Sequence, residues 1–145
     1  MRSVLLLFAV PATMLLGRCA SRVDDGGNAA IARKMFEAFN AHQWETMAGY
    51  YSEPASFLDP SLGKTHLDQR RADVARKYAE MQKMFPDIHD KITGIYPSGD
   101  HVVVEFTSTG SAGDSISFSL PIVTVLTFRD GRIVKDATYY DLENP

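Results

Sequence analysis

The chain has 145 residues, of which 45% are hydrophobic and 23% are charged, a length and composition that predict one folded domain with one core. Its 15 basic and 18 acidic residues give a net charge of −3 without any clustered basic stripe, so we expect no nucleic-acid partner. Cys19 is the single cysteine, so no internal disulfide can form, and the residues after it contain no thiolate for a metal site or catalysis.

Residues 1–21 have the pattern of a signal peptide. Arg2 gives a positive start, residues 4–16 are mostly apolar and include one proline, and small residues follow at Gly17, Cys19 and Ser21. The apolar run is too short to span a bilayer as a mature helix. We therefore expect an exported protein. Loss of the three arginines in residues 1–22, which contain no acid, would change the net charge from −3 to −6.

Two interpretations of the cleavage site stay open. Residues 16–19 resemble the bacterial lipobox, in which the cysteine, here Cys19, is lipidated and becomes the new N-terminus. Arg18 departs from that pattern, because a small residue usually precedes the cysteine. Ordinary cleavage after Ser21 is the alternative. The protein is accordingly expected to be secreted, periplasmic or lipid-anchored, with membrane contact only through the leader or a lipid.

The first half of the remaining chain is predicted to be mainly helical. Residues 22–28 form a polar linker, and apolar residues at helical spacing follow. The predicted helices cover residues 29–40, 44–51 and 67–85. Between the last two, residues 55–58 form a short strand that stops at Asp59-Pro60, and residues 61–66 form a loop.

The second half is predicted to form an antiparallel sheet over residues 88–96, 101–109 and a long hairpin in residues 115–142. In the hairpin, residues 116–122 alternate between apolar and other side chains, and Asp130-Gly131 is a strong signal for a tight turn. Helices placed ahead of an antiparallel sheet are typical of the α+β class. A strongly bent sheet covered by the helices would form a cone with an apolar pocket.

This order of elements resembles the SnoaL-like branch of the nuclear transport factor 2-like superfamily over about residues 29–142. The residues that carry the likeness are Phe39-Asn40-Ala41, Tyr50-Tyr51, Phe57-Leu58-Asp59-Pro60, Phe85-Pro86-Asp87-Ile88, Phe128 to Val134 and Tyr139-Tyr140-Asp141. The resemblance implies an α+β cone-shaped barrel, a strongly curved mixed or antiparallel sheet with three N-terminal helices enclosing a pocket. This fold hosts isomerases, cyclases, dehydratases, hydrolases and non-catalytic binding domains.

The resemblance also carries chemistry, residue by residue. Asn40 and Asp59-Pro60 are similar to motifs of ketosteroid isomerases, where the acid before proline is the proton-shuttling base, which makes Asp59 the candidate catalytic residue. The two oxyanion donors of that family do not carry over, because Met35 and Thr124 stand in their places. Thr124 also stands where SnoaL-type cyclases have an acid–base aspartate. Loss of one such donor commonly costs on the order of 100-fold in rate, so ketosteroid isomerase activity is not expected.

Each candidate also has a structural interpretation. Asp59 could cap the backbone after a turn instead of acting as a base, and His66 and His89 could be surface histidines instead of acid–base partners. The expected pocket walls are Trp44, Tyr51, Phe57, Phe106, Phe118, Thr124 and Tyr139, for whose aromatic members core packing is the alternative. The four histidines are scattered and no glycine-rich phosphate loop follows a strand, so we expect neither metal nor cofactor.

Two functions from different classes follow. One is an exported enzyme that performs cofactor-free acid–base chemistry (isomerisation, cyclisation or dehydration) on a small, mostly apolar molecule. The other is a non-catalytic module that holds a small ligand, or forms a homodimer through the open face of the sheet. A buried ionisable group with a shifted pKa and no competing salt bridge would favour the enzyme. Purely apolar walls would favour the binding module.

We predict that residues 1–21 are absent from the natively expressed protein. Mass spectrometry of that protein tests this expectation. A lipid-modified Cys19 at the new N-terminus would select the lipoprotein interpretation, and cleavage after Ser21 would select free secretion. Detection of an intact Met1 would contradict both.

Overall fold

The structure is a computed structural model that describes residues 26–113 and 116–141, so the predicted leader and Cys19 lie outside the described residues. The helices are α1 (Gly27–Asn40), α2 (Trp44–Ala48), the short 3-10 helix η1 (Pro60–Leu62) and α3 (Arg71–Met84). The strands are β1 (Tyr51–Leu58), β2 (Leu67–Gln69), β3 (His89–Ser98), β4 (His101–Ala112), β5 (Ile116–Arg129) and β6 (Arg132–Tyr139). No helix in this described part is long and apolar enough to cross a membrane.

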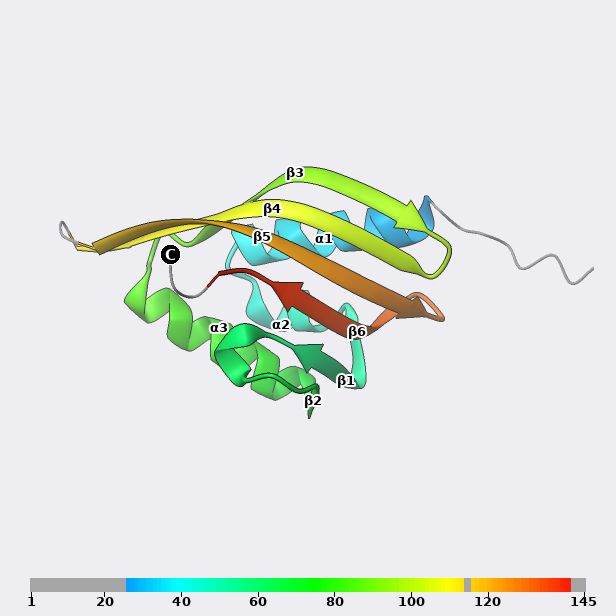
Figure 1. The fold of residues 1–145 in the computed structure, drawn as a ribbon. Helices are drawn as coiled ribbons and strands as arrows, with labels where there is room; N and C mark the ends of the chain where they lie inside the picture. The colour runs from blue at the N-terminus through cyan, green and yellow to red at the C-terminus, as the bar shows by residue number, and fades with distance from the viewer. Residues whose placement is uncertain (1–25, 114–115, 142–145) are drawn as a thin grey trace, which may run out of the picture.

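The strands form one six-stranded mixed sheet in the order β2-β1-β6-β5-β4-β3. Only β1 and β6 are paired in parallel, and the other neighbours are antiparallel. Figure 1 shows the curled sheet with α1 behind β3, β4 and β5 and with α3 running below it toward the far end of β4 and β5. The predicted α+β architecture is confirmed, but the sheet is curled and not closed into a barrel by hydrogen bonds.

The sheet owes its inner face to the two-residue alternation of its strands. On β4, Val102, Val104 and Phe106 are buried, whereas the residues between them are more exposed. The hairpin turn between β5 and β6 places Asp130 at φ 51° and Gly131 at φ 71°. Two successive positive φ angles are the geometry that an Asp-Gly pair favours in a tight turn. The predicted hairpin therefore forms at the predicted turn.

Two of the predicted helices include residues that form strands, in both cases because strand pairing outweighs helical spacing. The helix predicted for residues 44–51 ends at Ala48, and Tyr51 instead begins β1 opposite Ile133 of β6. The helix predicted for residues 67–85 begins only at Arg71. Its first three predicted residues form β2, which pairs with residues 55–57 of β1.

Aromatic contacts join the helices to the sheet. Phe36 of α1 meets Phe106 of β4 edge to face, with ring centroids 4.9 Å apart. Phe39, one turn further on, contacts the rings of Trp44 on α2 and Tyr78 on α3, each at 5.2 Å. Edge-to-face aromatic pairs add to the free energy gained by burying apolar area. The three helices are thus held in one layer against the inner face of the sheet.

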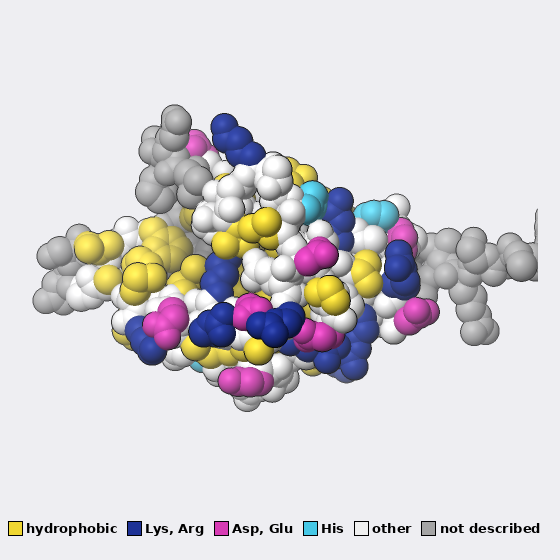
Figure 2. Space-filling view, turned by 90° about the horizontal axis from the view of Figure 1, so that it is seen from below, with side chains coloured by type: hydrophobic (Ala, Val, Ile, Leu, Met, Phe, Trp, Pro, Cys, Tyr) yellow, Lys and Arg dark blue, Asp and Glu magenta, His cyan; other side chains and the backbone are white. Residues whose placement is uncertain are grey.

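Viewed from below, the surface mixes charges of both signs (Figure 2). Hydrophobic side chains gather at the end of this face where the tips of β4 and β5 lie near the end of α3. Met84 and Ile116 are among the exposed large hydrophobic residues of the described chain.

Ile133 and Ile116 form a matched pair for testing the core, because Ile133 is 0% exposed and Ile116 is 60% exposed. We predict that Ile133→Ala lowers the free energy of unfolding by about 2–5 kcal/mol through lost burial and the cavity left behind. Ile116→Ala should change it by less than about 0.5 kcal/mol. Urea denaturation measures both values. Equal effects would contradict the described position of β6 in the core.

Candidate functional site

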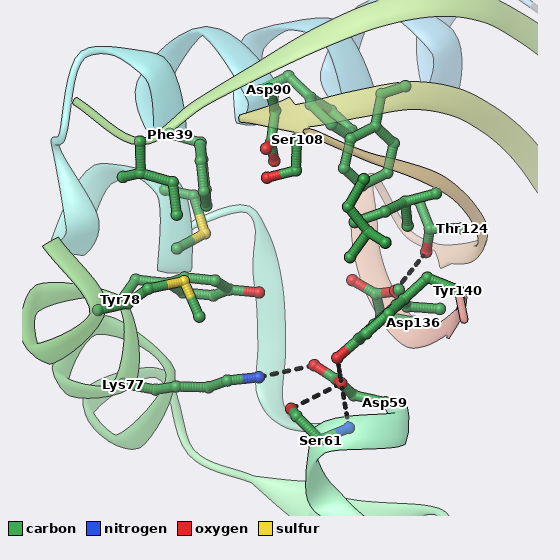
Figure 3. A pocket seen from close by; sticks show the side chains of 18 of the residues that line it. Phe39, Asp59, Ser61, Lys77, Tyr78, Asp90, Ser108, Thr124, Asp136 and Tyr140 are labelled. Carbon is green, nitrogen blue, oxygen red and sulfur yellow. Dashed lines mark hydrogen bonds and ion pairs between the residues drawn. The ribbon is translucent and has the colours of Figure 1, made fainter. Parts of the chain in front are cut away.

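A cavity of about 200 Å³ lies between the helices and the inner face of the sheet. Its walls are mostly apolar, and a site-sized cavity of that kind suits a small organic molecule. The apolar side chains that line it are Met35, Phe36, Phe39, Met47, Met81, Phe85, Ile88, Phe106, Phe118, Leu120 and Ile122. Figure 3 shows the polar side chains placed among them, which come from β3 to β6, α3 and the segment around η1.

Asp90, the second residue of β3, is the buried acid of the cavity. The residue is only 7% exposed, and its Oδ1 atom has no hydrogen-bond partner among the described residues. Burial raises the pKa of the Asp90 carboxyl to about 7, and a hydrogen bond from the Ser108 side chain opposes this rise only in part. Asp90 forms no salt bridge with any described residue, so nothing in that part of the chain neutralises its charge.

The backbone of Asp90 is fixed by Asn40, the last residue of α1. The Asn40 Nδ2 atom donates to the Asp90 carbonyl oxygen at 2.8 Å, and the Asp90 N–H donates to Asn40 Oδ1 at 2.8 Å. His42 lies beside this junction, with its Nε2 atom 3.0 Å from the Ile88 carbonyl oxygen. Asn40 was singled out from the sequence. Its side chain holds the acid-bearing strand in place and does not line the cavity.

Asp136 of β6 is a second buried acid, but its oxygens are occupied. Tyr51 donates its hydroxyl to Asp136 Oδ2 at 2.7 Å, and the hydroxyls of Thr124 and Thr138 donate to Oδ1. Burial raises the pKa of Asp136, and the hydrogen bonds from these hydroxyls lower it in part. Asp136 is therefore more tightly held than Asp90, and is less available to a bound molecule.

Tyr78 of α3 directs a hydroxyl group toward the middle of the cavity, between Asp90 and Asp136 (Figure 3). This hydroxyl makes no hydrogen bond to another described residue. Burial, followed by the charges of Asp136, Asp59 and Asp90, raises the pKa of Tyr78 well above its usual value. The phenol therefore keeps its proton at neutral pH, and it is a free hydrogen-bond donor facing the cavity.

Asp59 lies at the edge of the cavity in a network of its own. Lys77 Nζ is 2.7 Å from Asp59 Oδ2, while the Ser61 N–H, the Ser61 hydroxyl and the Tyr140 hydroxyl all donate to Oδ1. Partial burial raises the pKa of Asp59, but Lys77 and the hydrogen bonds from Ser61 together outweigh it, so the pKa lies below its usual value. The carboxylate caps Ser61 of η1 and is paired with a cation. The ion pair with Lys77 is the kind of competing salt bridge whose absence would have favoured Asp59 as the base of an enzyme.

The predicted wall residues divide into two groups. Tyr51, Phe106, Phe118 and Thr124 line the cavity, whereas Trp44, Phe57 and Tyr139 do not. Tyr139 is 53% exposed because Thr138 and Tyr140, its neighbours on either side, take the inward positions. Trp44 packs between the rings of His42 and Tyr78, and its indole N–H donates to Gln82. Phe57 is buried against Tyr51.

Tyr78, Asp90 and Asp136 are among the polar cavity residues that were not identified as site residues from the sequence. A signal existed for Asp90, because strand alternation places it on the same face as the apolar Ile88 and Ile92. An acid on an apolar face is a candidate functional residue. Within residues 26–113 and 116–141, no three His, Cys, Asp or Glu side chains lie together in a way that could hold a metal ion.

The pKa of Asp90 predicts a pH-dependent stability. The folded protein binds this proton more tightly than the unfolded chain, so the stability gained from protonation is full below about pH 4 and is lost as the pH rises to about 7. At about 1.4 kcal/mol per unit, a rise from 3.8 to about 7 corresponds to about 4 kcal/mol. We predict that Asp90→Asn removes this fall in the free energy of unfolding.

Urea denaturation at several pH values between 4 and 8 tests this expectation. Asp68→Asn is the matched control, because Asp68 is exposed on β2 outside the cavity, and its curve should run parallel to that of the wild type. Asp136 contributes a fall of the same sign in all three proteins. Parallel curves for wild type and Asp90→Asn would show that Asp90 does not titrate in this range.

Comparison with solved structures places this cavity in a known fold. A protein of ketosteroid isomerase-like fold from Catenulispora acidiphila, in complex with trimethylamine, is 23% identical with a TM-score of 0.68, over 77% of this chain and 85% of that one. An LEH-like epoxide hydrolase from M. tuberculosis is 18% identical with a TM-score of 0.69, over 81% and 85%. A SnoaL-like protein of unknown function from Burkholderia thailandensis is 19% identical with a TM-score of 0.68, over 82% and 98%.

At these identities the likeness shows the fold. No match was found among curated proteins. A family model, the SnoaL-like domain, matches residues 32–135, which include most of α1, the strand that carries Asp90 and the first part of β6. The match covers more than half of the chain and agrees with the resemblance in the sequence. The chain therefore belongs to the SnoaL-like domain family.

Proposed function

We propose that this protein binds a small, mostly apolar molecule in its cavity and catalyses proton transfer on it without a cofactor, with Asp90 as the base. The observation that carries this proposal is the Asp90 carboxyl, which is buried, lacks a cation and has one oxygen without a partner. Its pKa of about 7 suits a group that must both accept and return a proton near neutral pH. Asp59, paired with Lys77, is a weaker base.

Asp90 and Tyr78 can perform two different parts of the proton transfer, as base and as hydrogen-bond donor. The free oxygen of Asp90 would take a proton from a carbon next to a carbonyl group, and the electron pair of that C–H bond would move to the carbonyl oxygen. The Tyr78 hydroxyl is the free donor that can stabilise the negative charge there. Return of the proton to another carbon completes an isomerisation. Ketosteroid isomerases have two oxyanion donors at the positions of Met35 and Thr124. Tyr78 can supply one such donor to the substrate in this cavity.

The size of the cavity limits the substrate. A cavity of about 150 Å³ in another protein holds benzene, so about 200 Å³ suits a molecule with one substituted ring or a short branched chain. Among the structural neighbours, one is a complex with trimethylamine and another is an LEH-like epoxide hydrolase. These neighbours support a small-molecule partner for the fold. Small-ligand binding without turnover is the second candidate, and the apolar walls favour it.

Deuterium exchange tests the proposal without a known substrate. In D2O near neutral pH, the protein should catalyse exchange of the acidic C–H protons of a small cyclic enone such as cyclohex-2-enone, followed by NMR. We predict that Asp90→Asn lowers the catalysed rate by about 100-fold or more. Tyr78→Phe should lower it by about 100-fold, the usual loss for one oxyanion donor. The rate should rise with pH and level off above about 7, because the base must be unprotonated.

Matched controls separate chemistry from folding. Asp68→Asn removes an exposed carboxylate, and Tyr96→Phe removes a hydroxyl that bonds the exposed Glu105 outside the cavity. Both should leave the rate unchanged. A rate in Asp90→Asn equal to that of the wild type would remove Asp90 as the base. Enone binding without any catalysed exchange would instead favour the binding module.

A further inference from the structure

We infer that the cavity is also a binding site for small organic ammonium ions, with the Asp90 carboxylate as their counter-ion. The inference goes beyond the proposed proton transfer and makes such a cation a competitor of the substrate, because it would occupy the atom that acts as the base. It rests on three observations: the excess of acidic over basic groups in the cavity, the Asp90 Oδ1 atom without a hydrogen-bond partner, and the aromatic and methionine side chains of the walls.

The charged groups of the cavity do not balance. Among the described residues that line it, Asp59, Asp90 and Asp136 are acidic and Lys77 is the single basic residue. Lys77 is already paired with Asp59 at 2.7 Å. Its ammonium group is therefore not available to either buried acid. A cation that enters the cavity meets uncompensated carboxyl groups, whereas an anion would meet like charge.

Asp90 Oδ1 lacks the hydrogen bond that an ammonium group can supply. A buried acceptor without a partner is destabilising, and an N–H⁺ donor would form a charge-assisted hydrogen bond with it. Asp136 is a poorer counter-ion, because Tyr51, Thr124 and Thr138 already donate to it. Asp90 is thus the preferred position for the cationic nitrogen.

The walls suit the organic part of such an ion. Phe36, Phe106 and Phe118 line the cavity together with Tyr78 and the three methionines Met35, Met47 and Met81. Aromatic rings attract cations through their electron-rich faces, and thioethers adapt to irregular apolar shapes. A small ammonium ion with a ring or branched alkyl group would meet one carboxylate and otherwise apolar surface.

Binding should depend on pH in a defined direction. The cation needs the ionised form of Asp90, so its affinity should fall as the pH drops below about 7. The charged or titratable groups that line the cavity together with this carboxyl are Tyr78 and Lys77 on α3, Tyr51 on β1, Asp136 and Tyr140 on and after β6, and Asp59 beside η1, and Ser108 on β4 donates a hydrogen bond to it. The pKa values of the three tyrosines lie above their usual range, and Asp59 stays ionised, so these groups do not titrate near pH 7. The pKa of Asp136 is also raised, so its titration can add to the pH dependence of binding. The Asp90→Asn variant retains Asp136, and comparison with the wild type therefore isolates the contribution of Asp90.

Titration calorimetry with cyclohexylammonium and its neutral analogue cyclohexanol tests the inference. At pH 8 the cation should bind at least about tenfold more tightly than the alcohol. At pH 7 each bound cation should release up to about half a proton, measured by comparing buffers of different ionisation enthalpy, because Asp90 is then about half protonated. Cyclohexanol should release none.

The variants make the result specific. Asp90→Asn should abolish both the preference for the cation and the proton release, while Asp68→Asn should retain both. Equal affinities for the two compounds in the wild type, or a preference that survives in Asp90→Asn, would overturn the inference. If Asp90→Asn does not fold, an absence of proton release in the wild type still overturns the inference.

The exchange assay keeps this inference separate from the proposed function. Cyclohexylammonium should inhibit enone exchange competitively. Catalysed exchange that the cation does not inhibit would overturn the inference and leave the proposed function intact. Tight cation binding without catalysed exchange of the enone would support the inference and contradict the proposed function.

Discussion

Two hydrogen bonds between the Asn40 side chain and the backbone of Asp90 join the end of α1 to the start of β3, and the cavity depends on this junction. The amide of Asn40 donates and accepts at once, so it satisfies both backbone groups of one residue. It fixes the strand at the position where the carboxyl of Asp90 faces the cavity. The same helix carries Met35, Phe36 and Phe39 into the cavity wall. These two hydrogen bonds thereby fix the position of the Asp90 carboxyl relative to the apolar wall of the cavity.

The three acids of the cavity differ in the hydrogen-bond donors around them and in whether a cation lies beside them. Asp59 has a cation and several donors, Asp136 has hydroxyl donors without a cation, and Asp90 has neither a cation nor a partner for Oδ1. The pKa of the first lies below its usual value, and the other two lie above theirs. Burying a carboxyl without compensation costs stability, which is consistent with a functional position for Asp90.

The fold followed from local patterns, whereas the polar site depended on contacts that no pattern contains. Helical spacing predicted α1, and the Asp130-Gly131 turn predicted the β5–β6 hairpin, because both signals arise from neighbours in sequence. The pairing of Lys77 with Asp59 could not be predicted, since their positions on α3 and beside η1 become close only after folding. That pairing decides which acid is the stronger base. Tyr78 lies in the predicted helix of residues 67–85, and its hydroxyl could not be placed in the cavity from helical spacing alone.

The irregular pairing of β5 with β6 has a consequence for how this domain can change. Between Thr127 and Phe128 the register shifts, so that Ile133 and Asp136 both face inward although they are three residues apart. Deleting one residue between them would leave them two residues apart, which strict alternation places on the same face. Asp136, Thr138 and Tyr140 would then still face the cavity, and Ile133 would stay in the core. Loss of the register shift in a chain of unchanged length would instead turn these three polar side chains toward solvent. The polar wall of the cavity therefore tolerates loss of the extra residue in β6, but it does not tolerate loss of the register shift while that residue is present.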